Sequence, residues 1–278
     1  MSGRYKLSWL CEALMVSRSG YYDWLGRRAH PGPRARENAL LRQRIRAAFE
    51  HSRRTYGSPR ITRALGGRVS RQRVARLMKQ ERLKARWISK FKVPTTDSTH
   101  ADPIAPNRLP GLEVRHPNQV WATDATAILT GQGWLYLVAV LDLHSRRIVG
   151  WSMDQYLDAR LAMSALAMGL AGRRPPSGLI VHSDRGSQFA SREYRALLAR
   201  HGLVASMSRQ GNCYDNAFIE SFWSSLKYEV VYHRRFSSFA EARSAVFDYI
   251  ETFYNRSRLH SSLGYVSPTM FESQLNQN

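Results

Sequence analysis

Three apolar segments joined by short turns limit most strongly what this chain can fold into. They are QVWATDATAIL (119–129), WLYLVAVLDL (134–143) and RRIVGWSMD (146–154), and GQG (131–133) forms the first turn. Strands that follow one another across such short connections pair as neighbours in an antiparallel meander. The sequence therefore predicts a sheet that begins near residue 119.

Helices and further strands alternate after this meander. The pattern predicts helices at 158–172 and 191–202, buried strands at 178–184 and 203–208, and two long helices at 216–232 and 239–254. Strands that alternate with helices are typical of an α/β sheet with parallel pairs. The order strand-strand-strand-helix-strand-helix-strand-helix is that of the ribonuclease H-like fold, with its mixed five-stranded sheet.

Charge is distributed unevenly along the chain. Residues 1–110 contain 25 Lys and Arg against 7 Asp and Glu, whereas residues 111–278 contain 17 against 14. A cationic module beside a nearly balanced one indicates contact with a polyanion, most simply nucleic acid. From charge alone, a ribosome-associated or merely soluble basic protein is the alternative.

The basic part, residues 1–92, is predicted to be an all-α DNA-binding region. After a helix at 37–51 comes YGSPRITRAL (56–65), a glycine-containing turn, and a basic segment at 70–85 for which Ser70 is a suitable N-cap. A helix, a turn with glycine and a basic helix outline a helix-turn-helix. The predicted DNA-contacting residues share the polar faces of the last helix: Arg71, Arg73, Arg76 and Lys79. A solvated helix face is the alternative.

Two short helices are also predicted around a turn at 8–25. Ser17 is placed to cap the second, which contains Tyr21, Tyr22 and Trp24. The pattern fits a packed aromatic cluster without a ligand or a small DNA-facing helix-turn-helix. A proline-rich linker is predicted at 93–118, and a catalytic domain at 119–278.

Neither cysteine nor any apolar run points to an extracellular or membrane protein. Cys11 and Cys213 lack partners at zinc-site spacing, and the apolar runs are too short to span a bilayer. No signal peptide is recognisable at the start of the chain. We therefore expect a soluble cytoplasmic protein without a membrane partner.

Three carboxylates are the candidate catalytic residues. Asp124 lies mid-strand among apolar neighbours, Asp184 ends a buried strand, and Glu220 follows it after 35 intervening residues. Glu220 lies outside the helix arc that we expect to pack on the sheet, which consists of Phe218, Ile219, Phe222, Trp223 and Leu226. An Asp124 bonded to the backbone for structural reasons is the alternative, and His182 fits either a supporting role at the site or a satisfied core histidine.

Carboxylates that converge in this way remain ionised together only if cations neutralise them. All-oxygen ligation favours Mg²⁺ or Mn²⁺ over Zn²⁺. Two such ions roughly 3.5–4 Å apart serve an in-line phosphoryl displacement. We therefore expect Asp124, Asp184 and Glu220 to hold two Mg²⁺, for which Mn²⁺ substitutes.

Five motifs in order resemble one family. WATDAT, HSDRGSQF, the 35-residue gap, NAFIESFWSSLK and YNRSRLHSSLGYVSP (254–268) are similar to the B-frame transposases of the bacterial insertion-sequence three family. The resemblance implies a retroviral-integrase-like DDE core with Asp124, Asp184 and Glu220 as its metal-binding catalytic triad. It also implies that Lys227 contacts the end of the element. Ala127 departs from the family, which often has an aromatic residue there.

The resemblance implies partners as well. They are double-stranded DNA, as the terminal inverted repeats of the element and its target, and an upstream A-frame protein or a frameshift fusion with it. A homo-oligomer on paired ends and association with the nucleoid are further expectations. The alternatives are a ribonuclease H-like nuclease that cuts without joining, and a non-catalytic DNA-binding regulator that uses only residues 1–92.

Overall fold

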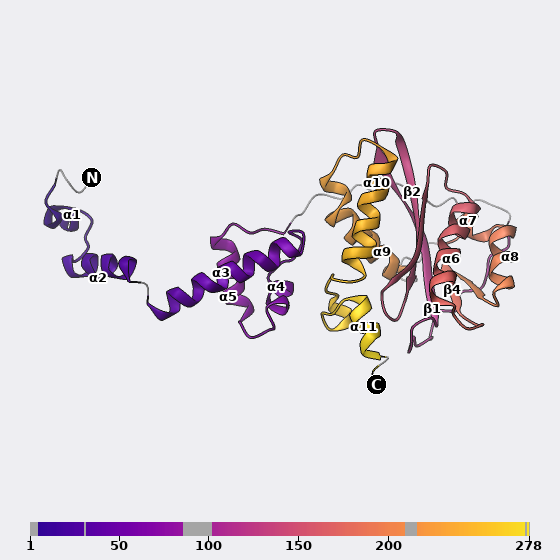
Figure 1. Cartoon of the computed structure of the whole chain (residues 1–278), viewed down its shortest axis with the longest axis horizontal. Coiled ribbons are helices and arrows are strands. Elements are labelled where there is room, and N and C mark those ends of the chain that lie inside the picture. Colours follow the sequence, from indigo (N-terminus) through magenta and orange to yellow (C-terminus); the bar gives the residue numbers. More distant parts are fainter. Residues whose placement is uncertain (1–4, 31, 86–101, 209–215, 276, 278) are drawn as a thin grey trace. The chain divides into compact units, whose positions relative to one another are not determined.

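The structure is a computed structural model that describes residues 5–30, 32–85, 102–208, 216–275 and 277 (Figure 1). It separates into two compact units, residues 1–85 and 86–278. Cys213, residues 86–92 of the predicted DNA-binding region and residues 93–101 of the predicted linker lie outside the described residues.

The first unit begins with the predicted pair of short helices, α1 (Leu7–Ala13) and α2 (Arg18–Ala29). Ser17 caps α2, because its side chain accepts a hydrogen bond from the Gly20 amide at 3.0 Å. The Tyr21 ring contacts those of Tyr22 and Trp24, but the last two side chains are 55% and 46% exposed. The aromatic residues therefore touch one another without forming the packed cluster that was one alternative.

Three helices form the core of the rest of this unit: α3 (Pro33–His51), α4 (Ser58–Ala64) and α5 (Arg71–Gln80). Their buried side chains are Leu41, Ile45, Phe49, Ile61, Val74, Leu77 and Met78. The α4–α5 turn contains Gly66 and Gly67 at φ +84° and +70°, a backbone region that residues with a Cβ seldom adopt. The helix expected to reach residue 85 ends at Gln80 instead, because Arg82 takes a left-handed φ of 55°.

The second unit is built on a five-stranded sheet. Its strands are β1 (Val120–Thr130), β2 (Gly133–Asp142), β3 (Ile148–Asp154), β4 (Ile180–Ser183) and β5 (Val204–Met207), in the order β3-β2-β1-β4-β5. β1 pairs antiparallel with β2 and parallel with β4, and the outer pairs β2–β3 and β4–β5 are antiparallel and parallel. The predicted ribonuclease H-like fold with a mixed sheet is confirmed.

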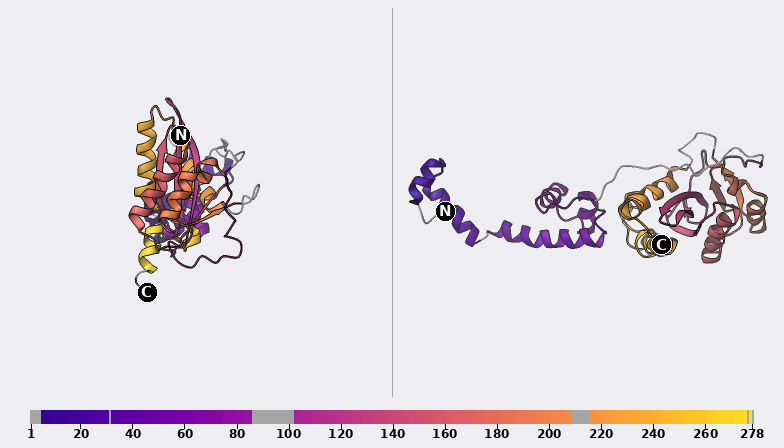
Figure 2. Two further views of the ribbon diagram at one scale, coloured as in Figure 1. Left: turned by 90° about the vertical axis from the view of Figure 1, so that its right-hand side faces the viewer. Right: turned by 90° about the horizontal axis from the view of Figure 1, so that it is seen from above.

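Helices cover both faces of this sheet (Figures 1 and 2). On one side lie α6 (Ala159–Arg173), α7 (Ser187–Ala190) and α8 (Arg192–Arg200). On the other side lie α9 (Ala217–Glu229) and α10 (Phe239–Phe247), and α10 runs on into a π-helical turn, η2 (Asp248–Tyr254). In the described part of the second unit, the remaining elements are two short 3-10 turns, η1 (Val231–His233) and η3 (Ser261–Leu263), and α11 (Pro268–Leu275).

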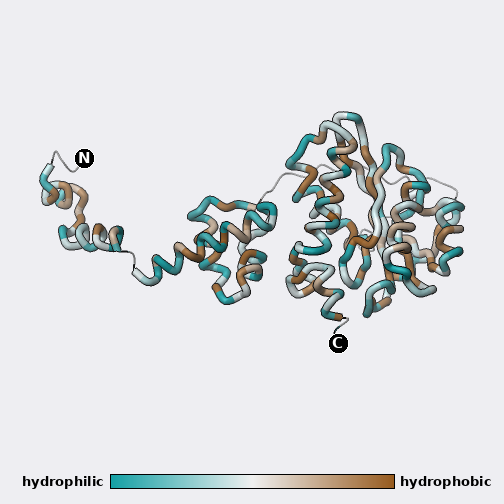
Figure 3. The backbone as a smooth tube through the Cα atoms, viewed as in Figure 1, coloured by the Kyte–Doolittle hydropathy of each residue, from teal (hydrophilic) through white to brown (hydrophobic). Residues whose placement is uncertain are grey.

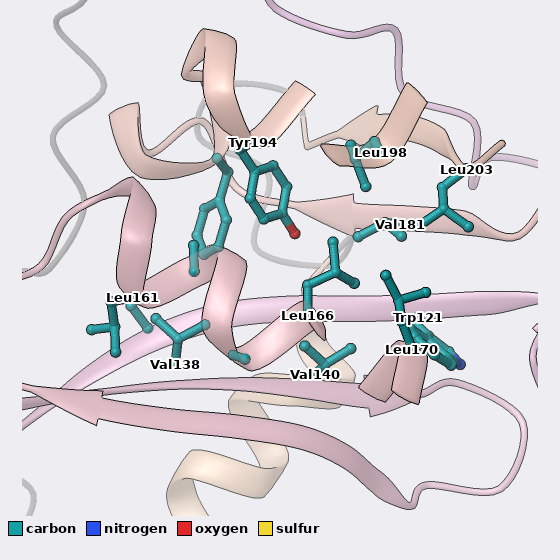
Figure 4. Packing of buried hydrophobic residues seen from close by; sticks show 14 of the residues in the cluster. Trp121, Val138, Val140, Leu161, Leu166, Leu170, Val181, Tyr194, Leu198 and Leu203 are labelled. Carbon is teal, nitrogen blue, oxygen red and sulfur yellow. The ribbon is translucent and has the colours of Figure 1, made fainter. Parts of the chain in front are cut away.

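The main core lies between the sheet and α6 (Figure 4). Side chains from β1 and β2, such as Trp121 and Val140, meet Leu166 and Leu170 of α6, and all are buried. α6 approaches β3 so closely that a Cβ on Gly150 would lie 2.2 Å from a helix carbonyl oxygen, so only glycine fits there. Figure 3 shows hydrophobic residues along these elements and hydrophilic ones along the outer turns.

Part of the predicted proline-rich linker lies along the second unit. The Arg108 amide donates a hydrogen bond to the Ser206 hydroxyl at 2.9 Å, and Ala105 packs against the core. Within the described residues, no helix is long and apolar enough to cross a membrane.

Candidate active site

Asp124 lies in the middle of β1, on the face that α9 covers. Side chains alternate along a strand, so Trp121 and Ala125 point into the core beneath α6 while Asp124 points to the opposite face. Asp124 Oδ1 accepts a hydrogen bond from the Ala125 amide at 2.8 Å, and Oδ2 accepts one from Trp223 Nε1 of α9 at 2.9 Å. Both oxygens of this carboxylate are thus held in place.

Asp184 follows directly after β4. Ala122 pairs with His182 in the parallel β1–β4 ladder, two residues before each aspartate, and Asp184 is close enough for its charge to act on Asp124. Asp184 Oδ1 accepts a hydrogen bond from the Gly186 amide at 2.9 Å. This turn fixes the carboxylate at the carboxyl end of the strand.

Glu220 is exposed in the first turn of α9. Ile219, Phe222, Trp223 and Leu226 are buried beneath the helix, as predicted, which leaves Glu220 on the other side. The prediction that Phe218 packs on the sheet is wrong, because its side chain is 43% exposed. The guanidinium of Arg146 instead lies over the Phe218 ring in a cation-π contact, with its Cζ 3.8 Å from the ring centroid.

Asp184 and Glu220 both act electrostatically on Asp124. Burial, and next the charge of Asp184, raise the pKa of Asp124 to about 7, and the charge of Glu220 adds to this effect. The Ala125 amide and the Trp223 indole oppose the rise by stabilising the ionised form. A carboxyl group whose ionisation two other carboxylates oppose is chemically suited to a cation.

The site is nevertheless not a closed ligand cage. Among the described residues, no group of three His, Cys, Asp or Glu side chains is close enough to hold a metal ion as it stands. The structure therefore brings Asp124 and Asp184 together on neighbouring strands and places Glu220 within electrostatic reach. The donor set consists of carboxylate oxygens, the ligands that Mg²⁺ and Mn²⁺ prefer.

His182 lies on the same face of the sheet as Asp124, but its two ring nitrogens are occupied. Nδ1 is 2.9 Å from the Ser206 hydroxyl and Nε2 is 3.0 Å from that of Ser208. The side chain is fully buried. Of the two interpretations of His182, the structure favours the satisfied core histidine.

Sequence reasoning missed the residues that hold α9 in place. At its end, Glu229 forms a buried ion pair with Arg258 at 2.8 Å, and Tyr249 donates a hydrogen bond to the same carboxylate. Arg258 also donates to the Ser225 hydroxyl of α9 at 2.9 Å. The signal for this contact was the YNRSRLH motif, which contains Arg258. Lys227, the predicted DNA contact, lies partly buried in the last turn of the same helix.

The predicted DNA-contacting residues of α5 fall into two groups. Arg71, Arg76 and Lys79 are exposed. Arg73 instead makes an ion pair with Glu37 at 2.9 Å and donates to the Asn38 side chain, so it ties α5 to α3. Hydrogen bonding and the opposite charge raise the pKa of Arg73 and lower that of Glu37, as expected for such a pair.

Known families and proteins resemble this chain over most of its length. The family described as "Integrase core domain" matches residues 114–213, a second model of that description matches residues 201–268, and "HTH-like domain" matches residues 35–91. The insertion element IS600 uncharacterized 31 kDa protein of Shigella sonnei is 44% identical, over 96% of this chain and 99% of its own.

Transposase InsF for insertion sequence IS3A of Escherichia coli (strain K12) is 42% identical, over 97% of this chain and 95% of its own. Among solved structures, the catalytic core domain of BIV integrase is 16% identical, with a TM-score of 0.44, over 58% of this chain and 97% of that one.

The order of the five-stranded sheet, the matching integrase-core and HTH-like families and the transposase relatives together define a DNA-acting enzyme with an integrase core. The chain belongs to the InsF-type transposases of the bacterial insertion-sequence three family. It is an insertion-element transposase of the DDE type, for which the family implies catalysis with divalent metal ions.

Proposed function

We propose that Asp124, Asp184 and Glu220 are the catalytic carboxylates of this transposase and that they hold two Mg²⁺ ions, which Mn²⁺ can replace. The observation that carries this proposal is the parallel pairing of β1 with β4, which ends two residues before both Asp124 and Asp184; the raised pKa of Asp124, to which both other carboxylates contribute, supports it. Such mutual repulsion is costly in an apolar setting and is relieved when cations bind. Metal binding would therefore draw Glu220 towards the two aspartates.

Each part of the chain has a distinct task in this proposal. When bound, the paired ions activate the attacking oxygen and stabilise the leaving one in an in-line displacement at phosphorus. Asp124 is held ready by the Ala125 amide and the Trp223 indole, and Asp184 by the Gly186 amide. Glu220 reaches the same place from α9, whose far end the Glu229–Arg258 pair fixes.

The proposed substrate is double-stranded DNA, as the terminal inverted repeats of the element and as its target. Water first attacks the phosphodiester at the end of the element and displaces its 3′-oxygen, which leaves a 3′-hydroxyl on the element and a 5′-phosphate on the flanking DNA. The 3′-hydroxyl then attacks a phosphodiester of the target, joins to the target 5′-phosphate and displaces the target 3′-oxygen. The exposed residues Arg71, Arg76 and Lys79 supply phosphate contacts for end binding, because cationic side chains release counterions from DNA. Arg73 supports this helix through Glu37. Lys227 contacts DNA beside the scissile bond.

We further propose the organisation in which this chemistry takes place. Residues 1–92 bind DNA, residues 93–118 connect, and residues 119–278 catalyse. An A-frame protein, separate or fused by frameshifting, completes end recognition, and two or more copies act on paired ends. The reaction takes place in the bacterial cytosol, at the nucleoid.

A strand-transfer assay on a labelled element end tests the proposal. The full chain with Mg²⁺ is expected to give joined products, and Asp124→Asn is expected to bind the end without cutting it. Asp154→Asn, which alters an exposed aspartate at the end of β3, is the matched control and should join normally. Cut products without joining would indicate a nuclease, and binding alone would indicate a regulator. Cleavage that persists in Asp124→Asn would remove Asp124 from the site.

A further inference from the structure

One hydrogen bond links two of the elements that supply the candidate carboxylates. Trp223 Nε1 of α9 donates to Asp124 Oδ2 of β1 at 2.9 Å. Trp223 lies three residues after Glu220, so it occupies the adjacent turn of the same helix. A single indole therefore connects the helix that presents Glu220 to the strand that presents Asp124.

The surroundings leave this indole little freedom. Its side chain is 6% exposed, and its ring centroid lies 4.8 Å from that of Phe222. Phe222 in turn packs edge-on against Tyr254 at 4.9 Å. An indole N–H is a donor only, and leaving a donor unsatisfied at a buried position destabilises the folded chain. The packing thus aims the N–H at one place, where the Asp124 carboxylate accepts it.

The bond also determines how Asp124 can meet a cation. A carboxylate offers about four lone-pair positions. The Ala125 amide takes one on Oδ1 and the Trp223 indole takes one on Oδ2. With one donor on each oxygen, the plane of the carboxylate is fixed, and each oxygen keeps a second lone pair for a metal ion. Hydrogen bonds of this kind to a ligating group hold its geometry and raise metal affinity.

We propose that Trp223 is a positioning residue, which orients Asp124 for metal binding through its indole N–H. The same bond holds Asp124 in a fixed position relative to the helix that contains Glu220. The inference rests on the proposed metal site at Asp124, Asp184 and Glu220. It extends that site by assigning a task to a residue that carries no metal-binding atom. Loss of the N–H is expected to weaken metal binding by about 10- to 100-fold.

The chain contains a matched control for this bond. Trp151 Nε1 of β3 donates to Glu251 Oε1, also at 2.9 Å. The Trp151 ring likewise packs against an aromatic neighbour, Phe247, at 6.2 Å. Both bonds join an indole to a carboxylate within one unit, but Glu251 is not one of the three candidate carboxylates. Removing the two N–H groups in turn separates a role in metal binding from a role in stability.

The test uses full-length chains and measures Mn²⁺ affinity by electron paramagnetic resonance of the free ion, with thermal melting in EDTA alongside. Trp223→Phe keeps an aromatic ring and loses the N–H. Trp223→His loses ring volume but can place an N–H at the position of the indole nitrogen. We expect Trp223→Phe to bind Mn²⁺ about 10- to 100-fold more weakly, Trp223→His to recover most of the affinity, and Trp151→Phe to match the parent chain.

Several results would overturn the inference. They are an unchanged affinity in Trp223→Phe, equal losses in both Trp223 variants, or a loss of cooperative melting in Trp223→Phe that Trp151→Phe does not share. Asp124→Asn distinguishes failure of this inference from failure of the proposed function. If Asp124→Asn binds Mn²⁺ as the parent does, the metal site itself lies elsewhere. If only Asp124→Asn weakens binding, the site stands and Trp223 has no part in it.

Discussion

Removing Arg258 should be among the most damaging single changes in the second unit, although Arg258 touches neither candidate aspartate. Its side chain is 6% exposed and that of its partner Glu229 is 8% exposed. Glu229 accepts from Arg258 Nη2 at 2.8 Å and from the Tyr249 hydroxyl at 2.8 Å. Burial and the charge of Glu229 raise the pKa of Tyr249, so Tyr249 remains a neutral donor.

The expected loss of stability in Arg258→Ala follows from the groups that would then lack a partner. Glu229 would remain in a buried place without its ion-pair partner, with the Tyr249 hydroxyl as its donor, and removing one member of a buried ion pair costs about 3–5 kcal/mol. In a unit of this size each kcal/mol lowers the melting temperature by roughly 2–4 °C, so a fall of roughly 6–20 °C is expected. Because the pair holds the end of α9, its removal should also reduce DNA cleavage.

Thermal and urea unfolding of the full chain measure this effect. The matched control is Arg115→Ala, because Arg115 pairs with Glu113 at 2.6 Å but both side chains are more than 70% exposed. An exposed pair contributes about 0–1 kcal/mol, so this variant should melt close to the parent. The double change Arg258→Met with Glu229→Gln should recover much of the stability. Equal, small effects of Arg258→Ala and Arg115→Ala would refute the reasoning.

Three further predictions concern charge. In EDTA, the raised pKa of Asp124 means that the parent chain loses stability as pH rises from about 4 to about 7. Thermal melts at pH 5 and pH 8 should therefore show Asp124→Asn to be the more stable chain at pH 8, by at most about 4 kcal/mol. An equal pH dependence of the two melting temperatures would contradict this. The exposed cations of α5 are Arg71, Arg76 and Lys79. Replacing them should reduce the slope of the logarithm of the DNA-binding constant against the logarithm of salt concentration by about 0.9 for each phosphate that the chain no longer neutralises. An unchanged slope would mean that this helix face is only solvated. Lys227→Ala should impair cleavage of the element's own end more than of a scrambled end, and a raised Mg²⁺ requirement with equal impairment on both would instead place Lys227 in the electrostatics of the metal site.

Periodicity was sufficient to predict the sheet and most of the helices. The mostly apolar residues of β1 and the apolar run of β2 reflect strands whose two faces are both buried, and short turns join antiparallel neighbours. Ser17 and Ser70 were recognisable as caps because capping is a local interaction.

Features that depend on tertiary contacts were not predictable in this way. The helix expected at 239–254 changes to π-helical geometry at Asp248. In a π-helix each backbone N–H bonds to the carbonyl five residues back instead of four, and the hydropathy pattern does not reveal such a change. Phe218 fits the apolar arc of α9, yet the guanidinium of Arg146, distant in sequence, lies over its ring. The helices α7 and α11 are too short for a periodic signal.

The candidate site shows the same division. The carboxylates were identifiable because buried or converging acids need a chemical reason, and their spacing matched a family. Trp223 was assigned only to the buried side of α9, since an apolar arc does not reveal where an indole N–H points. Arg73 was grouped with the DNA contacts because charge alone does not reveal a partner such as Glu37.

Anomalous diffraction from a crystal of the chain soaked in Mn²⁺ would show whether Asp124, Asp184 and Glu220 hold metal ions, because it locates the ions independently of activity. We expect two peaks about 3.5–4 Å apart between Asp124 and Asp184, with Glu220 of α9 turned towards them. The Asp124→Asn crystal, treated identically, should lose at least one peak. Peaks at other carboxylates, or none at this place while the chain still cuts DNA with Mn²⁺, would contradict the account.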